Sequence, residues 1–269
     1  MFAIFWRTLK SRKLSLIIYS MAMVLSNLMF VAMFPTILEQ SANWEELTKA
    51  YPEGFLQAFG IETLSFKTLE SFLGIENFSI IWPLIATIFL VSVAGGAIAY
   101  EIERGTIEIM ISKPVSRTKI FFGKYLQGML ALVVFVGVSV FSVIPLAMLY
   151  DLEYNLDSYL AYGLIGLLFG WAIFSMTMMF SAFFSERSRP YMLTGGLLTG
   201  MYILNIILQF KEELDFLKYF TFFHYLDYNV VFLDAKIEWL SIAVFAGVAI
   251  ATTAAGMYWF NRRDIAITS

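Results

Sequence analysis

Six long apolar stretches divide this chain, and none of them contains Asp, Glu, Lys, Arg or His. A helix needs about 20 mostly apolar residues to cross the hydrocarbon core of a bilayer, and each stretch is long enough. Charged residues make up only 14% of the chain, against about 25% in a soluble domain. The sequence therefore predicts an all-α membrane protein, with residues 1–269 forming a single domain of six transmembrane helices. The predicted spans are residues 14–38, 78–100, 125–150, 159–184, 191–210 and 239–260.

The charged residues between the apolar stretches are unevenly distributed. Thirteen of the 18 Lys and Arg, but only five of the 21 Asp and Glu, lie in the N-terminal tail and in residues 101–124, 185–190 and 261–269. Segments rich in Lys and Arg remain on the cytoplasmic side of a membrane. We therefore predict a protein of the cell membrane with both termini and residues 101–124 in the cytoplasm, and with residues 39–77 and 211–238 outside.

The first outer segment contains amphipathic pieces, which include Trp44 and Phe55 among polar residues. This pattern predicts short helices that lie near the outer surface in contact with membrane lipids. The second outer segment is rich in Phe and Tyr between acidic residues. Indole side chains favour the boundary between membrane and water. The tryptophans that we interpret as anchors at this boundary are Trp82, Trp239 and Trp259.

The lack of charge within the spans restricts the function. An ion-coupled carrier generally keeps an ionisable group inside the membrane, and an aspartyl protease needs two carboxylates there. Ser139 follows a Gly-Val pair, as in some serine hydrolases, but the sole histidine, His224, lies in an outer segment. The chain has no Cys, no His-Glu-x-x-His zinc motif and no ATP-binding P-loop. We expect no catalysis, no bound metal or cofactor and no binding of nucleic acid.

Polar and small residues within the spans predict contacts between helices. We interpret Asn27, Gln127, Asn205 and Gln209 as hydrogen-bonding groups between helices, with the lining of a substrate path as the alternative. Glycines on one face of a helix, or spaced four apart, let helix backbones approach closely, either within one chain or between two copies. The glycines with this predicted role are Gly163, Gly166 and Gly170 in the fourth span and Gly196 and Gly200 in the fifth.

Residues 101–124 form a polar segment between two apolar spans. Ile107, Met110 and Ile111 make a short apolar stripe if this segment is helical. Pro114 ends such a helix, because it disfavours the α conformation of the residue before it, and Ser116 can cap the next one. A short helix with an apolar edge suits docking to a soluble partner, whereas the alternative is a loop that merely carries cytoplasmic charge.

The segment YEIERGTIEIMISKPVSRTKIFFGKY, residues 100–125, resembles the connection between the second and third helices of ABC-2 type transporter permeases. The outer YPEGFLQAFG, residues 51–60, and the terminal FNRRDI, residues 260–265, resemble further parts of that family. Together with the six spans, the resemblance covers essentially the whole chain. The positions that match the connecting pattern are Glu101 or Glu103, Gly105, Thr106, Pro114, Val115, Ser116, Arg117 and Lys124.

This resemblance implies the membrane subunit of an ATP-binding cassette exporter. In that family two identical or related permeases pair, and each docks a coupling helix onto a separate P-loop ATPase subunit that binds ATP and Mg²⁺. The resemblance implies export, and the charge-poor spans favour an amphiphilic, peptide, drug-like or lipid-like substrate. The alternative is a membrane anchor or signalling module that recruits a soluble partner through residues 101–124. The residues assigned to coupling are Glu101, Glu103, Arg104, Gly105, Thr106, Ile107, Met110, Ile111, Pro114, Arg117 and Lys124.

Overall fold

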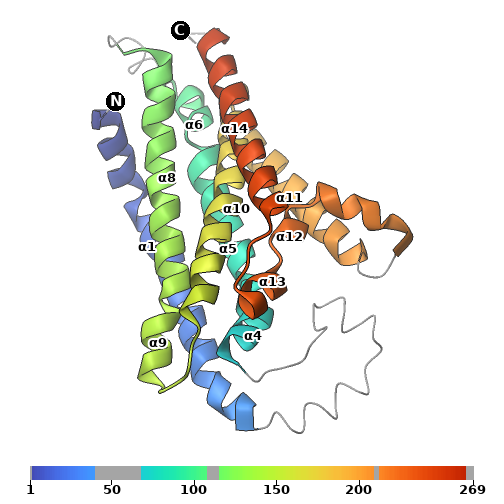
Figure 1. The fold of residues 1–269 in the computed structure, drawn as a ribbon. Coiled ribbons are helices and arrows are strands. Elements are labelled where there is room, and N and C mark those ends of the chain that lie inside the picture. Colours follow the sequence, from blue (N-terminus) through green and yellow to red (C-terminus); the bar gives the residue numbers. More distant parts are fainter. Residues whose placement is uncertain (1, 40–67, 108–114, 209–211, 265–269) are drawn as a thin grey trace.

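The computed structural model describes residues 2–39, 68–107, 115–208 and 212–264, in which helices alternate with short connections and no strand occurs (Figure 1). This confirms the predicted all-α class. The helices, including the π-helical η1 and the 3₁₀-helical η2, are α1 (Phe2–Glu39), α4 (Leu69–Leu73), η1 (Gly74–Phe78), α5 (Ile81–Gly95), α6 (Ala99–Glu103), α8 (Arg117–Phe141), α9 (Val143–Leu149), α10 (Leu156–Phe183), α11 (Ser188–Leu208), η2 (Glu212–Phe220), α12 (Phe222–Tyr225), α13 (Tyr228–Asp234) and α14 (Trp239–Arg262).

Five helical segments are long and apolar enough to cross a membrane: α1, α8 with α9, α10, α11 and α14. A sixth span exists only as a bent pair, in which residues 69–78 meet α5 at 46°. The prediction of a multi-pass membrane protein is therefore confirmed, and six spans are present if the bent pair crosses the membrane as one.

The second predicted span, residues 78–100, is wrong as one continuous helix. Helix α5 ends at Gly95, and the chain turns through residues 96–98 before α6 begins at Ala99. Successive glycines weaken a helix because they have the largest conformational freedom to lose. They also make room for the ring of Tyr191, which a Cβ atom on Gly95 would overlap.

The third span is longer than the predicted residues 125–150, because α8 already begins at Arg117. Ser116 caps this helix by accepting a hydrogen bond from Lys119 N, which confirms the role predicted for its side chain. An apolar stretch marks only the part of a helix that lies in the hydrocarbon core. The charged first turns of α8 were therefore not included in the predicted span.

Helix α10 lies at the centre of the bundle, next to α5, α8 and α14 (Figure 1). In its most apolar stretch 67% of the residues are buried, compared with 17% in the corresponding stretch of α11. The largest fully buried side chains are almost all aromatic: Phe89 stacks on Phe135 at 4.9 Å between ring centres, and Phe169 packs edge-on against Phe245 at 5.8 Å. The most buried helix therefore connects the others.

Trp82 does not anchor α5 at a membrane boundary as predicted. Its side chain is fully buried, and its Nε1 donates a hydrogen bond of 2.8 Å to Ser139 Oγ. The bent segment α4–η1 continues the bundle beyond the start of α5, so Trp82 faces neighbouring helices instead of headgroups. Trp239 and Trp259 are 83% and 49% exposed, in keeping with their predicted role.

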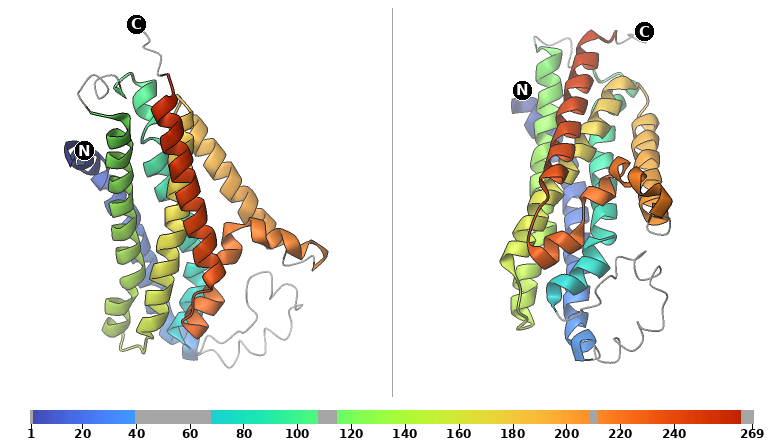
Figure 2. Two further views of the ribbon diagram at one scale, coloured as in Figure 1. Left: turned by 45° about the horizontal axis from the view of Figure 1, so that its top comes forward. Right: turned by 45° about the vertical axis from the view of Figure 1, so that its right-hand side comes forward.

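Helix α11 leans away from the other long helices toward its C-terminal end, so η2 lies beside the bundle (Figure 2). Helices η2, α12 and α13 lie in the second outer segment, residues 211–238, for which the sequence had predicted no helix. The short helices predicted around Trp44 and Phe55 fall outside the described residues.

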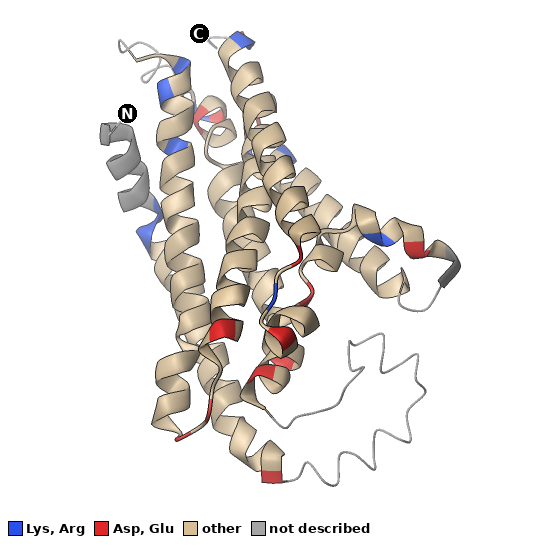
Figure 3. Ribbon diagram, viewed as in Figure 1, with Lys and Arg blue, Asp and Glu red and all other residues tan. Residues whose placement is uncertain are grey.

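Charge is separated along the bundle. Lys and Arg gather at the end where both termini lie, and most Asp and Glu of the described chain gather toward the opposite end (Figure 3). We call the first of these the basic end, defined by Arg12, Lys13, Arg104, Arg117, Lys119, Lys124, Arg187, Arg189, Arg262 and Arg263.

Candidate functional site

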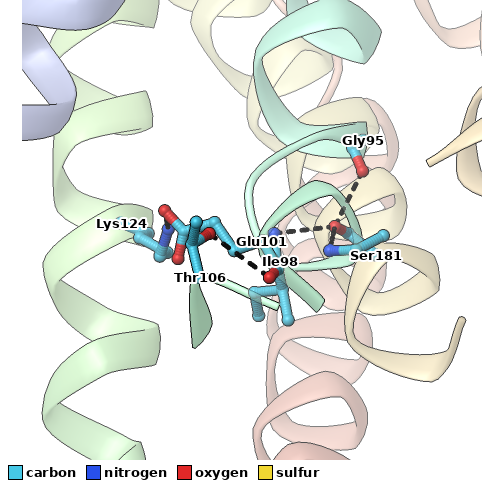
Figure 4. Close-up of polar contacts among 7 residues, drawn as sticks. Gly95, Ile98, Glu101, Thr106, Lys124 and Ser181 are labelled. Atoms are coloured by element: carbon cyan, nitrogen blue, oxygen red, sulfur yellow. Dashed lines mark hydrogen bonds and ion pairs between the residues drawn. The ribbon is translucent and has the colours of Figure 1, made fainter. Parts of the chain in front are cut away.

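Helix α6 lies at the basic end between α8 and α10, and several residues predicted for coupling meet there (Figure 4). Glu101 Oε1 forms an ion pair of 2.6 Å with Lys124 Nζ of α8. The Lys124 side chain is only 2% exposed and the Glu101 side chain 20% exposed. Removing one member of such a pair leaves the other charge in a poorly solvated place, so the two residues hold α6 and α8 together.

A tight turn follows α6. Gly105 adopts a φ of +69°, a left-handed conformation that glycine tolerates better than residues with a side chain. Thr106 Oγ1 then donates a hydrogen bond of 3.3 Å to the Glu101 carbonyl, closing the turn. Ile107 is 1% exposed and belongs to the hydrophobic core, so the chain points back into the bundle at this position.

Of the other residues of the predicted docking helix, Met110 and Ile111 of its apolar stripe and Pro114 at its end lie outside the described residues. Ile107 is buried in the protein itself, so it does not present the apolar edge to a soluble partner that the sequence predicted.

Of two further residues predicted for coupling, one connects α6 to its surroundings. Glu103 Oε2 accepts a hydrogen bond of 3.0 Å from the backbone N of Arg187, in the connection between α10 and α11. The guanidinium of Arg104 lies 4.5 Å from the centre of the Tyr100 ring, as in a cation–π contact, but Tyr100 belongs to α6 itself. Glu103 therefore ties α6 to the α10–α11 connection, and Arg104 covers the end of its own helix.

Arg117 joins the start of α8 to the end of α14. Its Nη1 donates a hydrogen bond of 3.2 Å to the Phe260 carbonyl and also contacts the Arg263 carbonyl. Arg263 in turn donates to the Ala182 carbonyl of α10 at 3.0 Å. The basic end thus links α6, α8, α10 and α14 through side chains that bind backbone carbonyls and carboxylates.

Ser181 of α10 is a residue of this region that the sequence analysis did not find. Its Oγ accepts hydrogen bonds of 3.0 Å from the N atoms of Ile98 and Ala99 and donates one of 2.8 Å to the Gly95 carbonyl (Figure 4). These backbone groups lack helical partners because the helix is broken between α5 and α6. Only the Gly95-Gly96 pair could have indicated the break, and nothing in the sequence singles out Ser181.

An apolar cavity of about 480 Å³ lies between α5 and α11. Leu84 and Ile88 line it from α5, and Tyr191, Leu198 and Tyr202 line it from α11. We call this cavity the α5–α11 groove. The buried Thr87 Oγ1, also at the groove, has no hydrogen-bond partner within the described chain. Its lining suits a hydrophobic molecule with few polar groups.

The glycines predicted to pack helices fall into two groups. A Cβ atom on Gly166 would lie 2.8 Å from the Trp82 ring, and one on Gly163 would lie 3.1 Å from the Phe141 ring. A Cβ atom on Gly170 would overlap Leu132. At Gly196 and Gly200 of α11, no described atom lies within 4 Å of such a Cβ, so packing there stays a prediction.

Two of the four polar groups of the spans have the ordinary role that the sequence favoured; Gln127 Nε2 is buried without a hydrogen-bond partner among the described residues, and Gln209 lies outside them. Asn27 donates hydrogen bonds to the Ser139 carbonyl at 2.7 Å and to Ser142 Oγ at 2.9 Å. Asn205 accepts one of 3.3 Å from Thr221. Among the described residues, no group of three or more His, Cys, Asp or Glu is arranged to hold a metal ion.

One comparison identifies the family. A model of the family described as ABC-2 family transporter protein matches residues 9–265. The chain belongs to the ABC-2 transporter family. A search of the curated proteins found no match.

The family match confirms the resemblance that residues 100–125 first indicated. ABC-2 permeases are generally non-catalytic membrane components of transport systems, and they normally work with an ATP-binding subunit. In this ABC-2 protein the matching residues Glu101, Gly105, Arg117 and Lys124 all lie at the basic end, where they form contacts among α6, α8 and α14.

Proposed function

We propose that this chain is the permease subunit of an ATP-binding cassette exporter in the cell membrane. Its membership of the ABC-2 family, over residues 9–265, carries the proposal. A separate P-loop ATPase subunit binds and hydrolyses ATP with Mg²⁺, and two permeases, identical or related, form the membrane part. Both termini and the basic end face the cytoplasm, which agrees with the preference of Lys and Arg for that side.

Residues 101–124 couple the two subunits. The contacts of Glu101, Glu103 and Arg117 at the basic end support this role, because they would carry a displacement of this segment into three long helices. The docking surface follows the buried Ile107 and includes Met110 and Ile111.

The α5–α11 groove holds the exported molecule. Its apolar lining supports an amphiphilic substrate of the peptide, drug-like or lipid-like class, since such a molecule can leave the bilayer for a hydrophobic cavity without losing its apolar environment.

The competing function is a membrane anchor that recruits a soluble partner through residues 101–124 without transport. Purification of the tagged chain from its native membrane distinguishes the exporter from the anchor. We expect an equal amount of a P-loop ATPase to remain bound and to hydrolyse ATP faster with the permease than alone.

Two variants make this experiment specific. Met110→Glu places a charge in the proposed docking surface and should release the ATPase. Asn261→Glu introduces the same carboxylate at the exposed end of α14, outside residues 101–124, and should retain it. Recovery of an intact permease with no ATPase, in a detergent that preserves its oligomer, would leave only the anchor.

A further inference from the structure

The break between α5 and α6 separates two sets of polar contacts. On the α5 side, the Ser92 carbonyl accepts hydrogen bonds of 3.4 Å from Arg12 Nη1 of α1 and from Tyr191 OH of α11. Residues 96–98 join this side to α6 without helical continuity. The end of α5 is therefore tied through polar groups to α1 and α11.

On the other side of the break, α6 is tied to different elements. Glu101 pairs with Lys124 of α8, and Glu103 binds the backbone N of Arg187 after α10. A displacement of the segment that follows α6 therefore acts first on α8 and α10.

Ser181 is the one side chain in the described chain that hydrogen-bonds to both sides of this break. Its hydroxyl has one donor and two acceptor sites, and all three are used: Gly95 O on the α5 side, and Ile98 N and Ala99 N on the α6 side. The residue is fully buried, so water does not replace these bonds while the contact is closed. Opening the break would leave three backbone groups without partners.

Tyr191 connects the same break to the α5–α11 groove. Its ring lies where Cβ atoms on Gly95 and Gly96 would be, and it also lines the groove. Any change in the direction of the chain at Gly95 and Gly96 must move this ring, because the glycine backbone is in direct contact with it. The shape of the groove therefore depends on the conformation of the break.

We propose that the α5–α6 break is a hinge and that Ser181 is its positioning residue. In one state its hydroxyl holds α6 against the end of α5. In the other state these hydrogen bonds are replaced by others, so that a displacement of residues 101–124 also moves Tyr191 and changes the groove. Coupling of this kind requires an element with two discrete arrangements. The inference rests on the proposed function, because it assumes that an ATPase moves residues 101–124.

The chain offers a matched control on the same helix. Thr177 of α10 is also buried, but its hydroxyl binds only the Ile173 carbonyl of its own helix, at 2.7 Å. Ser181→Ala and Thr177→Ala each remove one buried hydroxyl, and only the first affects the break.

The experiment uses the permease–ATPase complex in lipid nanodiscs and proteoliposomes, with a fluorescent lipid and an amphiphilic dye as transport probes. We expect Ser181→Ala to reduce the transport per ATP hydrolysed roughly fivefold or more, the lower range of typical coupling between sites, and Thr177→Ala to leave it unchanged. If the wild-type complex does not couple ATP hydrolysis to transport of either probe, the proposed function fails and the hinge fails with it. If the wild type couples but the two variants behave alike, only the hinge is refuted.

A measurement on the wild type covers the case in which Ser181→Ala does not fold. Hydrogen exchange at the Ile98 and Ala99 amides is compared without nucleotide and after trapping with ATP and vanadate. We expect the exchange rates to differ between the two states, with the amides of α10 as an unchanged reference. Equal protection in both states would exclude a hinge at this position.

Discussion

Helices α10 and α11 follow each other in the chain and have similar sequence patterns, yet they lie in different surroundings. Both are apolar, and both contain glycines spaced four apart. Side chains of neighbouring helices fill the space at Gly163, Gly166 and Gly170 of α10, while nothing described approaches Gly196 or Gly200 of α11. A small-residue pattern thus predicts that a helix can be approached closely, and the rest of the chain decides whether it is.

The comparison extends to the helices around them. Helix α10 belongs to a firmly connected half, with α8 and α14 tied to it by hydrogen bonds and aromatic contacts. Helix α11 leans away and leaves a cavity of about 480 Å³ against α5. Stability is expected to depend on the first half, and binding of substrate or of a second copy on the other.

The largest effect on stability is expected at the buried ion pair of the connected half. Lys124→Met leaves Glu101 without its cation, and breaking a buried pair costs about 3–5 kcal/mol. We expect a loss near the lower end, about 3 kcal/mol, because Glu101 retains 20% exposure. Unfolding in mixed micelles with increasing denaturing detergent measures it.

The double variant Glu101→Leu, Lys124→Met is the control. Replacement of both charges by apolar groups is often neutral, so it should recover most of the lost stability. If the Lys124→Met variant were as stable as the wild type, the ion pair at the basic end would not hold the connected half together.

The next effect is expected where α10 and α14 approach most closely. A Cβ atom on Gly256 would lie 2.9 Å from Met179 Cα, a backbone atom that cannot move aside as a side chain can. We expect Gly256→Ala to lower the free energy of unfolding by about 1–3 kcal/mol through overpacking. Gly247 lies on the same helix with no described atom within 4 Å of its Cβ position. Gly247→Ala, measured in the same detergent titration, should be neutral or slightly stabilising.

A smaller effect on stability is expected on α11. Gly200→Leu adds a large side chain where the described chain leaves space, so unfolding of the single chain should change by no more than about 0.5 kcal/mol. We expect the same variant to weaken pairing of two permeases, measured by chemical cross-linking in native membranes. A strongly destabilised Gly200→Leu protein would mean that α11 packs within its own chain, and the contrast with α10 would disappear.

Most of the fold could be predicted from the sequence, because long uncharged stretches have few alternatives in a membrane. Periodicity and caps also located Ser116, whose side chain needs only its own helix to act. The break after Gly95 was missed because a single helix and a broken one have the same hydropathy. Its stabilisation by Ser181 depends on α10, far away in sequence.

The candidate site was predicted only in part, again because its contacts join residues that are far apart in the sequence. The resemblance of residues 100–125 indicated Glu101 and Lys124, but their partnership depends on how α6 and α8 pack. Burial of Trp82 likewise required knowing that α4 and η1 extend the bundle beyond it. The sequence could predict that Gly166 or Asn27 contacts another helix, whereas it could not predict which residue is the partner.

The smallest effect is expected at His224 of α12, beside the loosely packed α11. Burial lowers the pKa of this imidazole below its ordinary value of 6.5, and the positive charge of Lys218 adds to the effect, while Asp227, Glu238 and Asp215 oppose it. The folded protein therefore binds a proton at His224 less readily than the unfolded chain does. Near pH 6 the unfolded state therefore takes up more protons than the folded state. The contribution of His224 to the free energy of unfolding is full above pH 6.5 and decreases as the pH falls through that value.

We accordingly expect the stability of the wild type to fall modestly between pH 7 and pH 5 relative to a His224→Gln variant, which cannot titrate. Thermal unfolding of both proteins across this range, in one detergent, gives the difference and removes the contribution of all shared carboxylates. Parallel pH profiles would mean that the rings of Tyr219 and Tyr225, 5.5 Å and 5.1 Å from the imidazole, do not keep it from water. The α11 side would then be still more loosely packed than its contrast with α10 implies.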